Sequence, residues 1–402
     1  MKNFLILVFT LIATATLCSA QTINDYIQSV DLIDMGNYEI PFSSDFCYFD
    51  GAIYYVTFDE EDEDKQRYSL VKKTPTSTET TEFYLNFHLI VNRGFWTITV
   101  DSNLVVLEDQ FVTYYFQRTP EGLKNILFTN LSVSTKQLKI FGNSIFRSHC
   151  DIQGSALWGK TQTWVEVFDL QKKTRRKYEF PNPLGIEYMY FTPRNLIEIT
   201  KENVYVMDVL DYKIKIYNYE GNLIDSIYKP FMDNKIVPTP INDQSKEELY
   251  KFDVMTQRVR RHSKTFEENW KNAKLMSRIN LLNDSTLLIC YTEPNGDFAT
   301  NVFDVWKLDT KKKKWVILKE GLKIEQYVNS EREGKFDIKR FPVFHNYSAF
   351  YNNVLVTQNN YSYDILKLKT YTTCKEFHSL NEDYLKKSEI PNTIFVYKFQ
   401  FN

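Results

Sequence analysis

The chain has 402 residues and a formal net charge of −2, with 51 acidic and 49 basic side chains. This balance gives no bulk positive field of the kind that attracts nucleic acid. The length exceeds what one small core needs, and the 27 Tyr and 30 Phe residues favour half-buried β-strands.

The first 20 residues predict an export signal. Lys2 supplies the positive start, residues 4–17 form the apolar stretch, and residues 18–20 make a small-residue cleavage site. The apolar run is too short for a membrane span, and no second such run follows it. A lipoprotein would carry its lipid on Cys18, but the residues before it form a poor lipobox. We therefore expect a signal peptide at 1–20 and a secreted or periplasmic protein with no transmembrane segment.

The mature part, residues 21–402, is expected to form one all-β domain. After a lead segment at 21–44, short alternating strands recur in six units, and units of this kind repeated radially build a β-propeller. Either the lead segment or the final strand at 394–401 should close the ring. The six units span residues 53–87, 96–128, 138–180, 196–227, 278–318 and 343–377.

The fourth unit, LIEITKENVYVMDVLDYKIKIYNYEGNLIDSI, is the clearest of the six. An apolar strand at 204–207 ends at Asp208, residues 213–217 alternate, and Gly221 turns the chain into Leu223. The part ENVYVMDVLDYKIKIYNYEGNLI resembles the NHL-type blade repeat. The whole chain resembles the secreted NHL-like or TolB-like six-bladed propellers of Bacteroidetes-type bacteria. The resemblance implies the fold and carries no catalytic residue onto this chain.

An insertion at 231–275, between the fourth and fifth units, is different in kind. Its middle is rich in helix formers, and Ser245 with Glu248 makes a plausible capping box. Leu249, Phe252 and Met255 form an apolar stripe beside a charged face. We expect one or two helices that cover part of the channel mouth, on the face where the second strands end.

Three runs of like charge interrupt the units. The acidic run at 59–64 is read either as a calcium loop or as a solvated hairpin tip, and its lack of Gly and of EF-hand spacing favours the tip. The basic runs at 172–177 and 311–314 each join the last two strands of a unit, so they should share the face opposite to the insertion. They are read as solvated turns, or as a surface for an anionic glycan or envelope partner.

The cysteines of the mature chain are predicted to be unbridged. Each falls in a different unit, and a disulfide would need Cα atoms within about 7 Å of each other. The spacing of Cys and His also predicts no zinc site. The four residues are Cys47, Cys150, Cys290 and Cys374.

Candidate site residues come from the ends of the second strands, which should emerge on one face around the central channel. A ring of acids there could hold a cation or sugar hydroxyls; alternatively, each strand-end Asp caps its own loop. Trp158, in the long loop of the third unit, could add an aromatic platform. The ligand-binding candidates are His149, Asp151, Trp158, Asp208, Asp211 and Glu293.

Enzyme signatures are mostly absent: the sequence has no GxSxG, HExxH, Walker or GxGxxG motif. His149 and Cys150 are neighbours on a strand, so their side chains point to opposite faces and form no nucleophile pair. The sequence therefore favours an exported, non-catalytic module that binds carbohydrate or a cell-envelope protein and needs no cofactor. The alternatives are a metal-dependent propeller hydrolase or lactonase with a divalent cation in the channel, and a subunit that serves only assembly.

Overall fold

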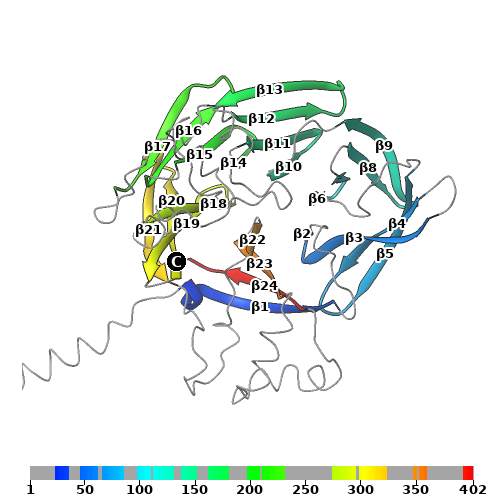
Figure 1. The fold of residues 1–402 in the computed structure, drawn as a ribbon, viewed down its shortest axis with the longest axis horizontal. Coiled ribbons are helices and arrows are strands. Elements are labelled where there is room, and N and C mark those ends of the chain that lie inside the picture. The colour runs from blue at the N-terminus through cyan, green and yellow to red at the C-terminus, as the bar shows by residue number, and fades with distance from the viewer. Residues whose placement is uncertain are drawn as a thin grey trace, which may run out of the picture.

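The computed structural model describes fourteen stretches of the chain, and every structural statement below concerns these residues. They are 23–35, 46–61, 66–85, 97–109, 112–130, 137–151, 162–180, 197–208, 211–230, 274–295, 298–323, 347–350, 353–359 and 393–401. Within them the chain forms six four-stranded antiparallel sheets arranged around one axis (Figure 1). The predicted six-bladed β-propeller is confirmed.

The first three blades follow one another along the chain, and each runs from its innermost to its outermost strand. Blade 1 is β2 (Cys47–Phe49), β3 (Ala52–Glu61), β4 (Gln66–Lys73) and β5 (Thr78–Leu85). Blade 2 is β6 (Thr97–Val100), β7 (Leu104–Glu108), β8 (Val112–Thr119) and β9 (Gly122–Asn130). Blade 3 is β10 (Gln137–Phe141), β11 (Ser144–Asp151), β12 (Gln162–Asp169) and β13 (Thr174–Phe180).

The next two blades repeat this order. Blade 4 is β14 (Ile197–Ile199), β15 (Asn203–Met207), β16 (Lys213–Asn218) and β17 (Leu223–Tyr228). Blade 5 is β18 (Leu275–Asn283), β19 (Thr286–Asn295), β20 (Phe298–Asp309) and β21 (Lys314–Lys323). Strands β15 and β19 are both second strands, so Val204–Met207 and Thr286–Cys290 occupy equivalent places in the two blades, as the repeat predicts.

The last blade joins the two ends of the chain. Its strands are β22 (Tyr347–Phe350), β23 (Val354–Asn359), β24 (Thr393–Phe399) and β1 (Ile27–Asp34), which follows the short 3-10 helix η1 (Ile23–Tyr26). Strands from both ends of the chain therefore close the ring, whereas the sequence predicted that either the lead segment or the final strand would close it. The strands expected at 363–368 and 372–377 lie outside the described residues, and β24 and β1 occupy the third and fourth places of this blade.

Strand direction divides the molecule into two faces. In blades 1 to 5 the connection from the first to the second strand and the connection from the third to the fourth strand emerge at the same edge, which we name the turn face; in the last blade the connection from β22 to β23 takes this place. Hydrogen bonds link these connections: the N–H of Arg118 donates to Asn103 O at 2.8 Å, and the N–H of Leu170 donates to Asn143 O at 2.9 Å. The second-to-third connections and the blade-to-blade crossovers emerge at the opposite edge, which we name the crossover face.

The crossover face is the one predicted for the insertion at 231–275. That segment leaves the end of β17 and enters β18, so both of its ends lie on this face. Its predicted helices and the stripe of Leu249, Phe252 and Met255 lie outside the described residues. The acidic run at 59–64 starts within β3, and the structure describes it as far as Glu61.

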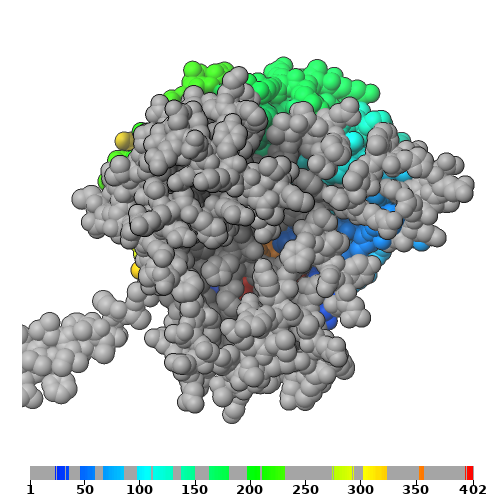
Figure 2. Space-filling model, viewed as in Figure 1, coloured from blue at the N-terminus to red at the C-terminus, as the bar shows by residue number. Residues whose placement is uncertain are grey.

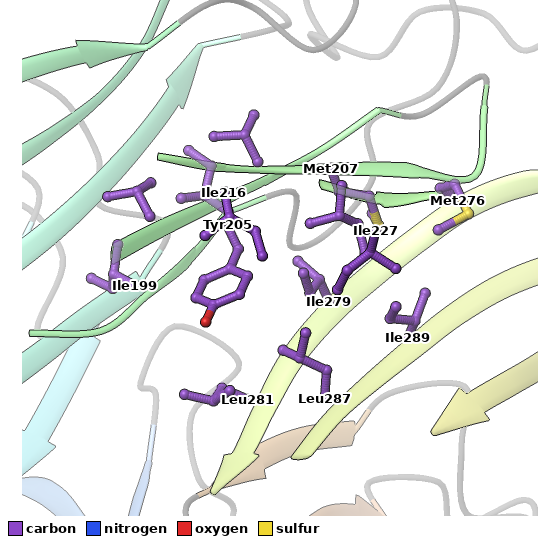
Figure 3. Close-up of a cluster of buried hydrophobic side chains, with 14 of the residues drawn as sticks. Ile199, Tyr205, Met207, Ile216, Ile227, Met276, Ile279, Leu281, Leu287 and Ile289 are labelled. Carbon is purple, nitrogen blue, oxygen red and sulfur yellow. The ribbon is translucent and has the colours of Figure 1, made fainter. Parts of the chain in front are cut away.

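The hydrophobic core lies between the blades, because each sheet packs one face on each neighbour. The largest cluster joins blades 3, 4 and 5, and Figure 3 shows side chains of blade 4, such as Ile227, packed against those of β18 and β19, such as Ile279 and Ile289. Other clusters fill the remaining gaps between neighbouring blades around the ring. Alternating apolar residues on each strand supply both faces. Outer strands reach the surface: the green segments, which include β13 and β17, form the upper rim in Figure 2.

Two of the four cysteines are described as buried thiols that form no disulfide, Cys47 and Cys290. The prediction is confirmed for these two. The side chain of Cys150 and all of Cys374 lie outside what is described.

Candidate ligand-binding site at the inner strands

Polar side chains follow the innermost strands of blades 3, 4 and 5, next to the central axis. In β10, Gln137 and Lys139 alternate with apolar neighbours, and in β14 Glu198 lies between two isoleucines. In β18, Arg278 and Asn280 alternate with Ile279 and Leu281 in the same way. Strand β10 contacts β14, and β14 contacts β18. Three short strands thus bring charged and amide groups to one wall of the channel.

Glu198 connects the three blades through its carboxylate. Oε1 accepts a hydrogen bond from Gln137 Nε2 at 3.0 Å and forms an ion pair with the ammonium of Lys139, both from blade 3. Oε2 accepts the backbone N–H of Leu281, from blade 5, at 3.0 Å. The Glu198 side chain is only 2 % exposed, whereas that of Lys139 is 27 % exposed. Lys139 therefore balances the negative charge of the Glu198 carboxylate. Of the two side chains, only that of Lys139 is reached by solvent to a sizeable extent.

Part of the hydrogen-bonding capacity beside Glu198 is unused. Within the described residues no hydrogen bond reaches Gln137 Oε1 or the Oγ of Ser148, although both atoms are shielded from solvent. Gln137 and Ser148 are cross-strand partners on β10 and β11, so their side chains lie on the same face of the sheet. Most buried polar atoms in folded proteins have a partner. Gln137 Oε1 and Ser148 Oγ are two exceptions that lie next to each other, beside Glu198 and Lys139.

Arg278 and Asn280 extend the polar wall toward blade 6. Their cross-strand partners on β19 are Cys290 and Leu288, and both of these belong to the cluster between blades 5 and 6. Arg278 and Asn280 are each 8 % exposed. The described wall therefore carries two cations, Lys139 and Arg278, and one carboxylate, Glu198.

The predicted site residue His149 is buried in the gap between blades 2 and 3. It is 3 % exposed and stacks on Trp164 of β12, with ring centroids 4.9 Å apart and an interplanar angle of 16°. The ammonium of Lys177 lies over the same indole, 4.7 Å from its centroid. His149 and Trp164 are cross-strand partners, so the pleat of the sheet places them together.

Glu293, the predicted site residue of blade 5, lies at the crossover face between two lysines. Its carboxylate is 2.9 Å from Lys274 Nζ and 3.0 Å from Lys323 Nζ. Partial burial would raise the pKa of Glu293, but the two ammonium groups outweigh it and hold the pKa below the ordinary value of 4.5. The carboxylate is therefore ionised and already paired.

The remaining predicted residues are placed only in part. Asp208 and Asp211 lie in the tight connection between β15 and β16, where the N–H of Asp208 donates to Lys213 O at 2.8 Å and the N–H of Lys213 donates to Asp211 O at 2.7 Å. Asp151 ends β11, but its side chain and all of Trp158 lie outside the described residues. Asp208 and Asp211 lie at the crossover face of blade 4, and the ligand-binding role of all four residues stays a prediction.

Two further second-strand acids, at the end of β7, have structural partners. Asp109 caps its own loop, because its Oδ1 accepts the N–H of Val112 at 2.6 Å. Glu108 pairs with the fully buried Arg147, with 2.5 Å between Oε1 and Nε. Arg147 also donates to Glu166 Oε1 at 2.9 Å and to the hydroxyl of Tyr115. Glu108 and Asp109 lie at a second-strand end, where the sequence predicted ligand-binding acids, but their described contacts are with the protein itself.

Known proteins resemble this chain in fold and not in sequence. No protein-family model matches the chain, and no curated protein matches it either. Among solved structures, it is similar to a predicted exported protein of Bacteroides fragilis, with a TM-score of 0.48 and 11% identity over 95% of this chain and 98% of that one. It is also similar to a member of the DUF4221 family from Bacteroides vulgatus, with a TM-score of 0.45 and 11% identity over 93% of this chain and 97% of that one. The WD40 domain of Toxoplasma gondii coronin matches with a TM-score of 0.36 and 6% identity over 73% of this chain and 66% of that one. No conclusion about function rests on these likenesses.

In the part of the chain that the structure describes, no three His, Cys, Asp or Glu side chains gather in a way that could hold a metal ion. No described helix is long and apolar enough to cross a membrane.

The inner-strand residues were not among the predicted site residues, which all lie at second-strand ends or in a loop. The available signal was the alternation within the short first strands, QLKIF in β10 and IEI in β14. A polar residue between two isoleucines in a strand next to the axis indicates a side chain aimed away from the core. Only the assembled ring shows that three such strands meet.

Proposed function

We propose that this protein is an exported, non-catalytic binding module of the NHL-like or TolB-like propeller type. Its ligand is carbohydrate or a cell-envelope protein, and it binds at the channel on the crossover face. The blade geometry supports the type: in blade 4 the second strand ends at Met207 and is followed by Asp208, and Gly221, with φ of +84°, lies in the turn into the fourth strand. Export rests on the predicted signal at residues 1–20.

The observation that carries the proposal is the unused hydrogen-bonding capacity of Gln137 Oε1 and Ser148 Oγ beside Glu198 and Lys139. Strand β10 begins at Gln137 and ends next to the turn face, so Gln137 lies toward the crossover face. Amide, hydroxyl and charged groups fixed on strands match the dense hydroxyl groups of a sugar. Carbohydrate is therefore the ligand class that this wall fits best.

A binding role fits these groups better than metal-dependent hydrolysis. Metal sites of that class need several carboxylates left open to the ion. The second-strand acids Glu108 and Glu293 are instead engaged by Arg147, Lys274 and Lys323. We therefore assign these acids to the scaffold.

Binding of a panel of oligosaccharides to the full mature chain tests the proposal, with calorimetry on any sugar that binds. Gln137→Ala removes the atom with unused capacity and should weaken binding by about tenfold, since one lost hydrogen bond to a ligand costs about 1–1.5 kcal/mol. Asn125→Ala, on the exposed outer strand β9, is the matched control and should leave binding unchanged.

Two results would contradict the proposal. One is sugar binding that Gln137→Ala and Asn125→Ala affect equally, which would place the site elsewhere. The other is a stoichiometric divalent ion in the purified protein together with hydrolysis of lactone or ester substrates. That result would favour the metal-dependent alternative.

A further inference from the structure

Two hairpins on the turn face carry dense positive charge. The hairpin of blade 3 joins β12 to β13 through residues 170–173, and the hairpin of blade 5 joins β20 to β21 through residues 310–313. All of their basic side chains are exposed. They are Lys172, Lys173, Arg175, Arg176 and Lys177 in blade 3, and Lys311, Lys312, Lys313 and Lys314 in blade 5. We name these two groups the basic hairpins.

The two basic hairpins have the same backbone. Asp169 Oδ1 accepts the N–H groups of the residues two and three positions later, at 3.0 and 2.9 Å, and Asp309 Oδ1 does the same at 3.0 and 3.1 Å. The last loop residues, Lys173 and Lys313, are both left-handed, with φ of 53° and 52°. Gly or Asn would adopt this conformation more readily than Lys. The two groups of basic side chains are therefore carried by turns that have the same backbone conformation and the same hydrogen bonds.

The turn face around them is built from short connections. Leu170 and Leu308, at the start of the two loops, donate their N–H groups to Asn143 O at 2.9 Å and Ser285 O at 2.8 Å in the neighbouring first-to-second turns. Among the connections described on this face, the strands are joined by two to four residues throughout. The described part of the turn face is therefore made of short, hydrogen-bonded turns, and the basic hairpins are exposed on it.

We propose that the turn face docks on an anionic lipid surface. Blade 4 separates the basic hairpins, so a small anion would contact only one of them, whereas a flat charged layer contacts both. Each Lys or Arg near an anionic bilayer adds to the attraction. This goes beyond the proposed sugar site, because Gln137 lies toward the crossover face. Docking by the turn face would hold the crossover face away from the lipid.

Co-sedimentation of the full mature chain with vesicles tests the proposal. Vesicles of phosphatidylglycerol mixed with phosphatidylcholine should bind the protein, and phosphatidylcholine alone should not. Higher salt should weaken binding, since the Debye length falls from about 10 Å at 0.1 M to about 3 Å at 1 M. Lys172→Gln with Lys173→Asn removes two of the five cations of the blade 3 hairpin, and Lys311→Gln with Lys312→Gln removes two of the four cations of the blade 5 hairpin. Asn tolerates the left-handed conformation at position 173.

Each pair of substitutions should lower the vesicle partition coefficient by about tenfold or more, and the two effects should multiply. Glu202→Gln with Glu220→Gln removes acids from exposed turns of blade 4, between the hairpins, and is a control of opposite sign that should raise binding. Circular dichroism and thermal melts check that every variant is folded.

The proposal is overturned if the protein binds both vesicle types equally. It is also overturned if only one hairpin affects binding, because that indicates a local anion site. Binding to soluble inorganic polyphosphate without sedimentation on vesicles would likewise overturn it, by assigning the basic hairpins to a soluble polyanion.

Discussion

At the scale of single residues, buried charge holds neighbouring blades together. Arg147 of blade 3 is fully buried and contacts Glu108 and Tyr115 of blade 2. Burial alone would lower the pKa of Arg147, but the carboxylate of Glu108 outweighs this and raises it, so the guanidinium stays charged. A buried pair of this kind is costly to break from one side, because the remaining charge loses its partner.

Replacing Arg147 by Met should therefore lower the free energy of unfolding by about 3–5 kcal/mol. The measurement is urea denaturation followed by fluorescence. The double variant Arg147→Met with Glu108→Leu should recover a large part of the loss, since the buried Glu108 charge is removed with Arg147 and Glu166 keeps Arg175 as a partner, at 3.4 Å. If the double variant is as unstable as the sum of the two single variants, the ion pair is not the cause.

Glu293 predicts how stability depends on pH. Its folded-state pKa lies below the ordinary value of 4.5, so its ion pairs with Lys274 and Lys323 stabilise the fold above that pH. The contribution is lost as the pH falls below 4.5 through the folded-state pKa. Glu293→Gln should thus destabilise the protein by about 0.5–1 kcal/mol at pH 7. The difference from the wild type should shrink in acid.

Unfolding curves measured from neutral to acid pH test this expectation. Glu82→Gln, on the exposed part of β5, is the control and should run parallel to the wild type. A Glu293→Gln variant whose deficit stays constant down to the lowest pH would contradict the assignment of the shifted pKa to Glu293.

At the scale of elements, the closing blade joins the N-terminal and C-terminal parts of the chain, and we name the β1–β24 pairing the joint of the ring. Strand β1 pairs with β24 in antiparallel register, with Ile33 opposite Ile394, and Lys398 Nζ reaches Asp31 Oδ2 at 2.9 Å. Ile33 is 1 % exposed and packs with Val354, Val356 and Val396 of the same blade. The N-terminal strand thus supplies both hydrogen bonds and core to a blade made otherwise by the C-terminal part of the chain.

Ile33→Ala should destabilise the protein by about 2–5 kcal/mol, the cost of a cavity in a core. Because the residue belongs to the joint, the loss should also expose the amides of β24 to hydrogen exchange before those of β15. Gln28→Ala, at an exposed position of the same strand, should change stability by less than about 0.5 kcal/mol. Equal exchange rates in β24 and β15 of the Ile33→Ala variant would show that the ring does not open at this joint.

The element scale also explains where the sequence prediction succeeded. The second strands and the basic hairpins were located from alternation, since buried faces repeat every second residue. The innermost strand of the first blade, Cys47–Phe49, was missed because three residues are too few to show a period. In the last blade, expected strands at 363–368 and 372–377 fall outside the described residues, and Thr393–Phe399 pairs with β23.

At the scale of the whole molecule, the two faces divide the proposed tasks. Gln137 and the strand-end acid Glu293 lie toward the crossover face, and the basic hairpins lie on the turn face. The alternating direction of four strands per blade fixes this division, because every crossover must start and end on the same side. The sugar site and the lipid-docking surface can therefore be tested independently, each with variants that leave the other face intact.

The sequence by itself determined most of the strands, the number of blades and the opposite faces of the basic hairpins and the 231–275 insertion. These properties depend on local alternation and on turns between neighbouring strands. Only the tertiary structure decided how the ring closes and which polar groups meet. Asp31 and Lys398 are 367 residues apart, and Glu198 takes partners 59 and 83 residues away in two other blades. No local period encodes such contacts, because they exist only once the blades are placed around a common axis.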